Sequence, residues 1–405
     1  MMQKTSLKNS ILRIFRLKNR EKQIAKRINI LKILYFTSVD VSGDDAPAVH
    51  VRGTCRALNE KGHKVALLHR LPVPNAHFYP SWLYNIRTAR WPRFRGGWMM
   101  FQIIASIKLI IMSKMLRPDF IYVRSPTGRI LRCALKIARS RVVWEINGLE
   151  GINSHATRQT MRICDLALVD SDGMRNEFSS TFPEFDEKIK RHLTFVTDPK
   201  CFYPIRKLDA TKDLGLSEDT IKVIHVSSFQ PWHDFDTMVS AFEGLCDITG
   251  PIQFFFIGDG PERANVIRRA REAGLVGAEF PGRIRNSDLH KYINCADVCV
   301  DIFSSDRLLG KNLGAYKIYE YMACARPVIT AVSDNFSPPD WARDFLYLIK
   351  PSSPAELRSA LLNVLANSED WNFKAKEAML YVQKNQTWSK ATDTTLHHLY
   401  ELMKK

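Results

Sequence analysis

The length, composition and charge of the chain limit what it can be. A chain of 405 residues is too long for one ordinary core, so two domains of about 150–200 residues are expected. Its 45% hydrophobic and 25% charged residues are usual for a globular protein, which argues against a chain without a core, whereas its net charge of +17 is unusual.

The first 30 residues carry nearly half of that excess charge. They contain nine Lys or Arg and one Glu, a net charge of +8, interleaved with apolar residues between positions 11 and 17. Such a basic amphipathic tail suits an anionic membrane surface, although it also suits nucleic acid or a solvated arm. Nucleic acid is not expected as a partner, because the tail has one aromatic residue and no nucleic-acid motif. The tail lacks the apolar segment and cleavage site of a signal peptide.

The first half of the chain alternates between short apolar runs and helix-like segments, which is typical of a parallel sheet with crossover helices. Strands are predicted at residues 31–36, 64–69, 120–124, 142–146 and 166–169, and helices at 48–59, 98–112, 128–140 and before 164.

The longest apolar run, residues 98–112, is interrupted by Gln102, Ser106 and Lys108. It is shorter than the roughly 20 residues that span a bilayer, so we expect a helix that covers a sheet, with an interfacial helix as the alternative. No transmembrane segment is expected, and the predicted location is the cytoplasm, with peripheral attachment to the inner face of the cell membrane as an option.

A second series of strands and helices starts after residues 201–204. Strands are predicted at residues 221–226, 252–257, 278–280 and 298–303, and helices at 235–246, 262–273 and 287–295. The stretch YKIYEYMACARPVIT, residues 316–330, opens like a helix and ends like a buried strand. We therefore predict a basic tail at 1–30, Rossmann-like domains at 31–199 and 200–375, and a helical segment at 376–405 that crosses back to the first domain.

The eight cysteines form no CxxC pair, and most lie in apolar runs. We expect small buried side chains in a reducing compartment, and no zinc site. They are Cys55, Cys133, Cys164, Cys201, Cys246, Cys295, Cys299 and Cys324.

Loops that follow the strands of the second half contain the candidate binding residues, because open parallel sheets bind ligands at the carboxyl ends of their strands. The turn with Gly258 and Gly260 lacks the third glycine of a dinucleotide fingerprint, since position 263 is Arg. The segment with Ser228 and His233 precedes a helix whose amides are candidates for holding an anion. Two glycines and two cations in residues 307–315 favour a phosphate cradle.

Glu320 stands among aromatic and small residues in the helix that follows this cradle. A carboxylate in a packed segment needs a partner, and the hydroxyls of a ribose would suit it. For each of these motifs a purely structural role remains open: a plain turn, a structural histidine, a basic surface loop and a solvated helical glutamate.

Taken in order, these segments resemble glycosyltransferase family 4, enzymes of the GT-B fold that use nucleotide sugars. The segments are VIHVSSFQPWHDFDTMVSAF, FFFIGDGPE, FPGRIRNSDLHKYINCADVCVDIF and YKIYEYMACARPVIT, with KILYFTSVDVSGDDAPAVHVRGTCRALNEKGHKVALL and RVVWEINGLEG in the first half. The terminal YVQKNQTWSKATDTTLHHLYELM is similar to the helix that crosses back to the first domain, so the resemblance covers about residues 31–403.

The resemblance implies two facing Rossmann-like domains with a deep cleft between them. It further implies a retaining transfer of sugar from a nucleoside diphosphate sugar to an acceptor hydroxyl, with Glu320 on the ribose of the donor. The predicted catalytic residues are His233, Lys311, Asn312 and Glu145. The predicted donor-binding residues are Glu320, Gly310, Leu313, Gly314, Arg283, Ile284, Gly258, Gly260, Ser228 and Gly43.

This sequence departs from the family pattern at three positions. Asn312 stands where the family often has a second acid, and Ser228 and His233 stand where it often has Arg and Lys. Related subgroups have a WHG-like loop, here residues 232–234, so the chain is still expected to be an enzyme. A protonated His233 would place charge near a phosphate, and Lys311, Arg307 and Arg283 are candidates for the remaining charge.

The first domain is expected to hold the acceptor, a glycan or a lipid-linked molecule, with Glu145 and Asn147 at a strand end and residues 42–44 near the donor. A structural role is equally open for Glu145, and structural roles are favoured for His50, which begins a helix, and His155, which we place in a loop. No metal or other cofactor is expected, because cations and a helix start would neutralise the diphosphate.

The expected role is assembly of a bacterial surface polysaccharide or glycolipid. The alternatives are a catalytically degenerate binding or regulatory protein, a nucleotide-sugar epimerase of the same fold, and a nucleic-acid-binding protein driven by charge.

Overall fold

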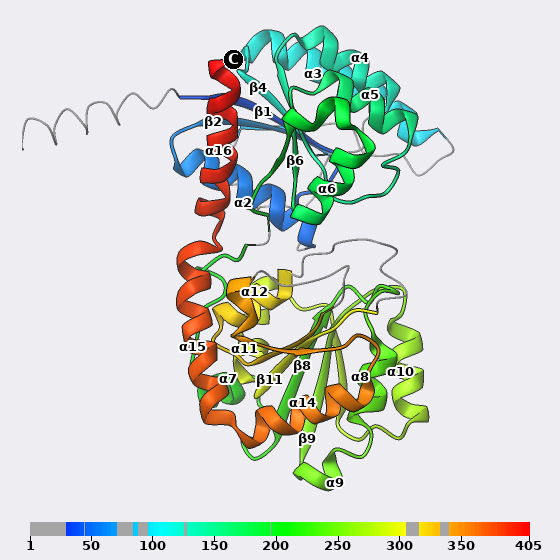
Figure 1. Ribbon diagram of the computed structural model, residues 1–405, viewed down its shortest axis with the longest axis vertical. Helices are drawn as coiled ribbons and strands as arrows, with labels where there is room; N and C mark the ends of the chain where they lie inside the picture. Colours follow the sequence, from blue (N-terminus) through cyan, green and yellow to red (C-terminus); the bar gives the residue numbers. More distant parts are fainter. Residues whose placement is uncertain are drawn as a thin grey trace, which may run out of the picture.

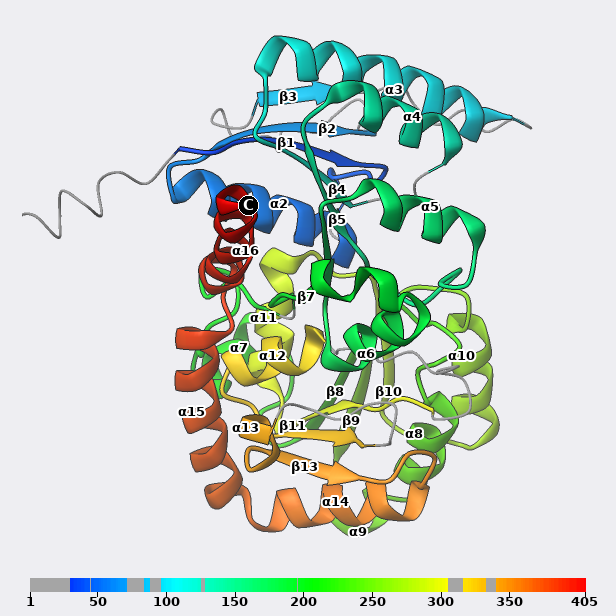
Figure 2. The same ribbon diagram turned by 45° about the horizontal axis from the view of Figure 1, so that its top comes forward.

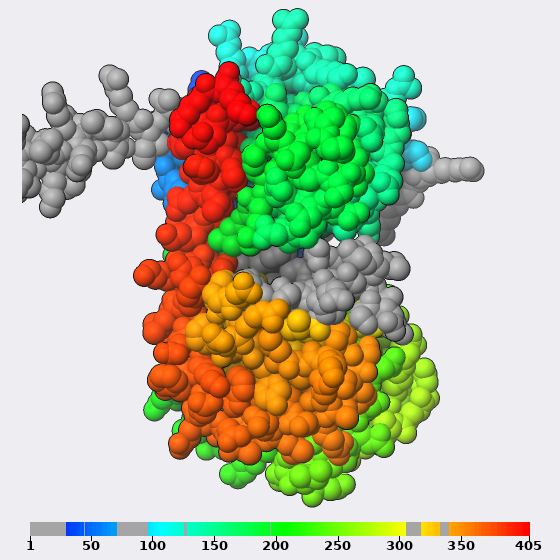
Figure 3. Space-filling model, in the orientation of Figure 1, coloured from blue at the N-terminus to red at the C-terminus, as the bar shows by residue number. Residues whose placement is uncertain are grey.

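The computed structural model describes residues 30–43, 45–70, 84–87, 96–124, 128–194, 196–304, 316–332 and 340–405. Two sheets of parallel strands organise these residues, one in each half of the chain (Figure 1). Helices flank both faces of each sheet, because strands in a parallel sheet are buried on both sides. Figure 3 shows an upper and a lower unit, joined along one side by α15 (Ser368–Asn385) and α16 (Trp388–Lys404).

The N-terminal sheet has the strand order β3-β2-β1-β4-β5-β6-β7. The order reverses between β1 and β4, which is the arrangement of a doubly wound nucleotide-binding sheet. Its strands are β1 (Lys32–Thr37), β2 (Lys64–His69), β3 (Tyr84–Arg87), β4 (Phe120–Arg124), β5 (Arg141–Glu145), β6 (Leu166–Val169) and β7 (Ile189–Arg191). The helices around it are α2 (Ala46–Glu60), α3 (Gly97–Leu116), α4 (Arg129–Ala138), α5 (His155–Ile163), α6 (Asp172–Thr181) and the 3-10 helix η1 (Pro183–Lys188).

The C-terminal sheet repeats this arrangement with the order β10-β9-β8-β11-β12-β13, reversing between β8 and β11. Its strands are β8 (Ile221–Ser227), β9 (Ile252–Gly258), β10 (Ala278–Gly282), β11 (Val298–Asp301), β12 (Val328–Ala331) and β13 (Leu346–Ile349). Its helices are α7 (Lys207–Asp213), α8 (Phe235–Phe242), α9 (Cys246–Thr249), α10 (Arg263–Glu272), α11 (Asn286–Cys295), α12 (Tyr316–Ala323), α13 (Asp340–Arg343) and α14 (Pro354–Ala366), followed by α15.

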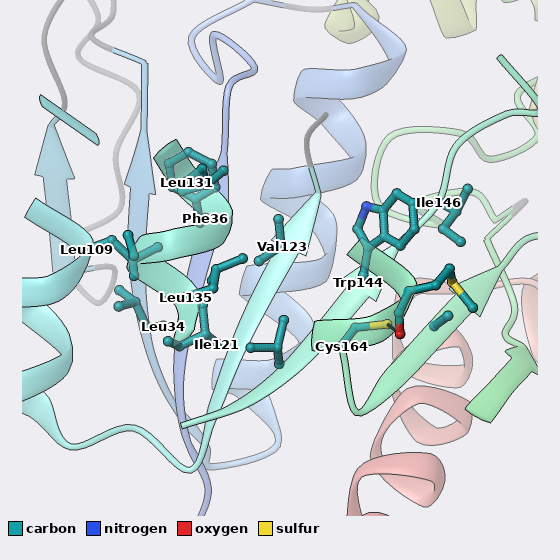
Figure 4. Packing of buried hydrophobic residues seen from close by; sticks show 14 of the residues in the cluster. Leu34, Phe36, Leu109, Ile121, Val123, Leu131, Leu135, Trp144, Ile146 and Cys164 are labelled. Carbon is teal, nitrogen blue, oxygen red and sulfur yellow. Dashed lines mark hydrogen bonds between the residues drawn. The ribbon is translucent and has the colours of Figure 1, made fainter. Parts of the chain in front are cut away.

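Successive side chains along each strand point to opposite faces of the sheet, so each core has two layers. In β1, Leu34 and Phe36 point to the layer under α3 and α4, where Leu109 and Leu131 meet them (Figure 4). Ile33 and Tyr35 point to the opposite layer, which α2 and α16 cover. Figure 2 shows α3 and α4 on the outer side of the sheet and α2 and α16 on the other side. The central strands are therefore mostly apolar, which is why they appear in the sequence as short apolar runs.

The last helix packs on the N-terminal unit. In α16, Trp388 lies against Gly53 of α2, where a side-chain carbon added to the glycine would lie 2.3 Å from Cε2 of the indole. Leu396 and Leu399 of the same helix are buried with residues of β1 and α2. The chain passes between the units twice, near residue 197 and near residue 386. The backbone N–H of Thr197 donates to the carbonyl of Gln386 at 2.9 Å, so these two connections are hydrogen-bonded to each other.

Most predicted elements appear within one or two residues of their expected bounds, and three strands, β2, β4 and β6, match completely. The prediction of one helix over residues 235–246 is wrong for the last four residues. The observed helix, α8, ends at Phe242, and the left-handed backbone of Gly244, with φ of 66°, separates it from the short α9. His155 does not lie in a loop: it is the first residue of α5, which Ser154 caps by accepting from the N–H of Thr157 at 3.1 Å.

The apolar run at residues 98–112 forms a helix that covers the sheet, as predicted. With 20 residues, α3 extends beyond the apolar run at both ends. By length and composition alone it could cross a membrane. Its inner face, with Phe101, Ala105 and Leu109, is buried over the sheet. Insertion across a bilayer would expose that layer of the core, so we assign α3 to the sheet.

We predict that Gly53→Ala lowers the free energy of unfolding by about 1–3 kcal/mol, because the new methyl group would overlap Trp388. Urea titration followed by circular dichroism measures the change. In a Trp388→Leu background the clash is absent, so the same substitution should be neutral or should stabilise α2 by up to about 1 kcal/mol. Equal losses in both backgrounds would contradict the contact.

Candidate functional site

The site lies at the carboxyl ends of the central strands β8, β9 and β11 of the C-terminal sheet, at the point where the strand order reverses. We call this row of strand ends the carboxyl edge, or simply the edge. Ligands of such sheets bind at this edge. The predicted donor-binding segments at residues 227–234 and 256–262 follow β8 and β9 there, and α12 with Glu320 is the first described element after residue 304.

The loops after β8 and β9 are packed directly on each other. Side-chain carbons placed on Gly258 and Gly260 would lie 1.8 and 1.9 Å from the backbone oxygens of Ser227 and Ser228, respectively. The N–H of Glu262 donates to the carbonyl of Phe229 at 2.9 Å. These two glycines are thus explained by the close approach of two backbones, and a direct role in donor binding stays a prediction.

The helix after the β8 loop does not offer an open N-terminus. Asp234 caps α8 by accepting from the N–H of Thr237 at 3.3 Å, and its other oxygen accepts from the N–H and hydroxyl of Ser352, both at 3.1 Å. A carboxylate at a helix start disfavours a second anion there. The expectation that the amides in front of α8 hold a phosphate is therefore not supported.

His233 lies at the same edge but is 8% exposed. Its ring centroid is 5.7 Å from that of His225 and 5.3 Å from that of Phe303. Burial, and secondarily His225, lower the pKa of His233 to about 3. The imidazole is thus neutral at neutral pH in this structure, which favours the role of a neutral hydrogen-bonding group over that of a charged partner of a phosphate. Its Nδ1 has no hydrogen-bond partner among the described residues, so it is available for a neutral hydrogen bond.

Glu320 is buried in α12 and paired within its own helix. Its side chain is 12% exposed, and Lys317, one turn earlier, donates from Nζ to Oε2 at 2.7 Å. Burial raises the pKa of Glu320, and Lys317 opposes that rise. The next residue, Tyr321, accepts through its hydroxyl from the N–H of Val226 in β8 at 2.9 Å, which holds α12 against the sheet edge.

A second buried acid, Asp301, ends β11 beside this pair. It is 1% exposed, and its Oδ2 has no hydrogen-bond partner among the described residues. Burial raises its pKa to about 8, while Lys317 lowers it and Glu320 adds to the rise. Lys317 therefore pairs with Glu320 and also lowers the pKa of Asp301, but not enough to ionise Asp301 at neutral pH. This cluster joins a proton donor, a carboxylate and a cation at the ligand-binding edge.

Glu145 ends β5 in the N-terminal unit and is fully buried. Arg124 donates from Nε to Oε1 at 2.9 Å, the His50 Nε2 lies 2.7 Å from the same oxygen, and Tyr35 donates to Oε2 at 3.3 Å. Burial alone would raise the pKa of Glu145, but His50 and Arg124 outweigh it and hold the pKa well below its usual value. Of the two roles left open by the sequence, this setting supports the structural one.

Several functional candidates at the strand ends of both sheets were not found from the sequence. Lys317 and Asp301 complete the cluster around Glu320, and Arg124 is the partner of Glu145. Asp170 follows β6, and burial raises its pKa to about 6. The available signal was positional, since Asp170 and Asp301 each stand at the end of a short apolar strand, where side chains of a parallel sheet face a ligand.

Two family models match the chain. Residues 207–379 match the model described as "Glycosyl transferases group 1", and residues 47–191 match the one described as "Glycosyltransferase Family 4". The chain carries the two domains of a family 4-like glycosyltransferase. No curated protein sequence matches it.

Solved structures place the transferase in the GT-B fold that the sequence predicted. Anabaena HepE in complex with UDP and glucose superposes with a TM-score of 0.71 at 14% identity, covering 92% of this chain and 100% of that one. Sucrose-phosphate synthase from Thermosynechococcus elongatus gives 0.70 at 18% identity over 92% and 99%. WaaG, a glycosyltransferase involved in lipopolysaccharide biosynthesis, gives 0.67 at 13% identity over 89% and 98%.

The other predicted site residues of the transferase lie at varied positions. Ser228, Arg283 and Asn147 are exposed at strand ends, and Ile284 packs against the core. The carbonyl of Gly43 accepts from Arg52, which holds the loop after β1. The predicted residues that lie outside the described part of the chain are Asp44, Arg307, Gly310, Lys311, Asn312, Leu313 and Gly314.

We expect Asp301→Asn to stabilise the transferase increasingly as the pH rises. Between the ordinary carboxyl pKa of 3.8 and the raised value of about 8, the folded chain keeps a proton that the unfolded chain releases, so the stability of the natural chain falls with pH. Urea unfolding from about pH 4 to about pH 8 should show the gap widening and then levelling off. The exposed Asp219→Asn serves as the control. A gap independent of pH would rule out a protonated Asp301.

Glu145→Gln should lower the free energy of unfolding by about 3–5 kcal/mol, because Arg124 would remain buried without its carboxylate. Thermal and urea unfolding measure this loss. If Glu145 is structural, the fraction of variant that is still folded should bind nucleotide as the natural protein does. A stable variant that has lost only its transfer activity would instead support the catalytic role.

Proposed function

We propose that the protein transfers a sugar from a nucleoside diphosphate sugar to an acceptor hydroxyl, with retention at the anomeric carbon. The bond between the anomeric carbon and the diphosphate oxygen breaks, a bond to the acceptor oxygen forms, and the acceptor loses its proton. The observation that carries this proposal is the buried cluster of Glu320, Lys317 and Asp301 at the carboxyl edge of the C-terminal sheet.

The cluster suits the ribose of a donor nucleotide. Lys317 donates to Oε2 of Glu320, and no hydrogen bond to Oε1 occurs among the described residues, so that oxygen is available to accept from ribose hydroxyls. A buried carboxylate rejects a ligand that lacks such donors, because desolvating it without replacement is costly. HepE is solved with UDP and glucose, and we propose a UDP-sugar as the first donor to test here.

The diphosphate of the donor needs positive charge as it leaves. With His233 neutral, we assign this charge to the start of α12 and to three candidate cations: Lys311 and Arg307, which precede α12 in the sequence, and Arg283, which follows β10. We propose no metal in this step. Among the described residues, no group of three or more His, Cys, Asp or Glu side chains is arranged to hold one.

We further propose a lipid-linked or glycan acceptor at the cytoplasmic face of the membrane, as in the assembly of a surface polysaccharide or glycolipid. The basic tail and the long apolar α3 support this choice of location. WaaG, which has the same fold, is involved in lipopolysaccharide biosynthesis.

A catalytically degenerate binding protein of the same fold is the second candidate. One observation favours it: His233 is neutral and Ser228 uncharged at the positions where the family often carries two cations. Such a protein would bind a nucleotide without turnover, or would bind none. An epimerase of this fold would process a nucleotide sugar without an acceptor.

Calorimetric titration with UDP, GDP, ADP and CMP tests the donor site directly. We expect one nucleotide to bind in the micromolar range and Glu320→Ala to weaken it by at least tenfold, about 1.4 kcal/mol, because the ribose loses its acceptor. Glu377→Ala on α15 is a control, since it removes an exposed carboxylate from a different helix.

The two candidates separate in this experiment. Binding that depends on Glu320, followed by turnover of the matching nucleotide sugar with an acceptor mixture, supports the transferase. Binding without any turnover supports the degenerate protein, and no binding by the natural chain contradicts the assignment of the donor site.

A further inference from the structure

The outer face of α3 exposes an unusual amount of apolar surface. Its inner face packs in the core, whereas large apolar side chains on the outer face are 40–69% exposed. They are Met99, Met100, Ile103, Ile107, Ile111 and Met115. At about 100° per residue, these side chains occupy roughly 160° of the helix surface. A contiguous apolar face of this kind marks an interaction site in a soluble protein.

Cations lie near this apolar face, at the end of α3 and on α4. Residues 96–141, which include both helices, contain nine Lys or Arg and a single acid, Asp119, and of the nine only Arg124 is buried in an ion pair with Glu145 among the described residues. Asp119 accepts a hydrogen bond from the backbone N–H of Lys32. Six of the cations are exposed: Lys114, Arg117, Arg129, Lys136, Arg139 and Arg141. None of these six forms an ion pair with a carboxylate within the described part of the chain.

Among the described residues, no element covers the outer face of α3. Figures 1 and 2 show α3 and α4 side by side on the outer side of the N-terminal sheet, away from the C-terminal sheet and from α2 and α16. The exposed Ile137 of α4 adds to the apolar surface. A planar partner can thus approach this side of the molecule without meeting the C-terminal unit.

We propose that the outer face of α3, with the cations of α3 and α4, docks the protein on an anionic lipid bilayer, with α3 lying in the plane of the interface. Apolar side chains enter the acyl boundary, and the cations remain among the anionic headgroups. The charge selects this occupant. A second copy of this surface, with its six exposed cations, would be repelled, and so would the protein's own +8 tail.

The docking surface deepens the proposed function and rests on it for its purpose, since a transferase that uses a lipid-linked acceptor has to reach the bilayer. Docking through the N-terminal unit would bring the unit assigned to the acceptor to the membrane. The contact itself does not require donor binding, so the two proposals fail separately.

Co-sedimentation of the full-length protein with vesicles tests the docking surface. Vesicles of phosphatidylcholine alone are compared with vesicles that also contain phosphatidylglycerol. In the test variant, Ile103→Gln, Ile107→Gln and Ile111→Gln are combined, which removes exposed apolar groups without touching the core. The matched control combines Ile248→Gln, Val276→Gln and Leu380→Gln, which are 61–68% exposed in the C-terminal half.

We expect the natural chain and the control variant to bind anionic vesicles equally within about twofold, and the α3 variant to bind at least tenfold more weakly. A charge variant, Lys136→Gln with Arg139→Gln and Arg141→Gln, should show a weaker preference for phosphatidylglycerol than the natural chain. Circular dichroism and nucleotide titration of each variant check that the fold and the donor site are intact.

Three results would overturn the proposal. The first is an α3 variant that binds vesicles as tightly as the natural chain, in which case the tail or another surface docks. The second is a natural chain that does not bind anionic vesicles. The third is a dimer, seen by analytical ultracentrifugation without lipid, that the α3 variant abolishes, which would make this face a contact between copies. Failure of the natural chain to bind any nucleotide would contradict the proposed function and leave the vesicle result standing.

Discussion

The packing of Trp388 against Gly53 is the contact on which the arrangement of the two units depends. A parallel sheet needs cover on both faces, and on one face of the N-terminal sheet α2 is buried together with residues of α16. The helix α16 comes from the far end of the sequence. Because a glycine at position 53 lets the indole approach the α2 backbone, the last helix joins the first core and ties the units together.

Each of the two units has buried carboxyl groups near the carboxyl ends of its strands, and their surroundings differ. Glu145 is surrounded by Arg124, His50 and Tyr35, so it stays ionised and its partners are all protein groups. Glu320 pairs with Lys317, Asp301 keeps its proton, and Oδ2 of Asp301 has no hydrogen-bond partner among the described residues, so hydrogen bonding there is incomplete. A fully hydrogen-bonded network serves rigidity, whereas an incomplete one at the carboxyl ends of the strands can be completed by a substrate. This contrast is why the donor site is assigned to the C-terminal unit.

The location of the site and the docking surface fit one physical scheme. The charge excess is concentrated in the tail and in residues 96–141, both in the first half of the chain, while the carboxylate cluster lies in the second. A protein arranged in this way can place its first unit against an anionic surface and keep the proposed donor site, at the carboxyl edge of the C-terminal sheet, in water. Long-range attraction of that kind weakens with salt, whereas the apolar contact of α3 does not.

The sequence by itself determined the fold class, the bounds of most of the elements that it predicted and the position of Glu320 in a packed helix, because apolar periodicity and strand–loop–helix order are local properties of the chain. It also indicated Glu145 as a residue at a strand end. It did not predict β3, β7 or β13. Tertiary structure alone decided which groups meet: Lys317 and Asp301 around Glu320, and Arg124 with His50 around Glu145. It also decided that His233 is neutral and that one face of α3 is open. Burial and pairing depend on contacts between distant segments, which no local pattern in the sequence records.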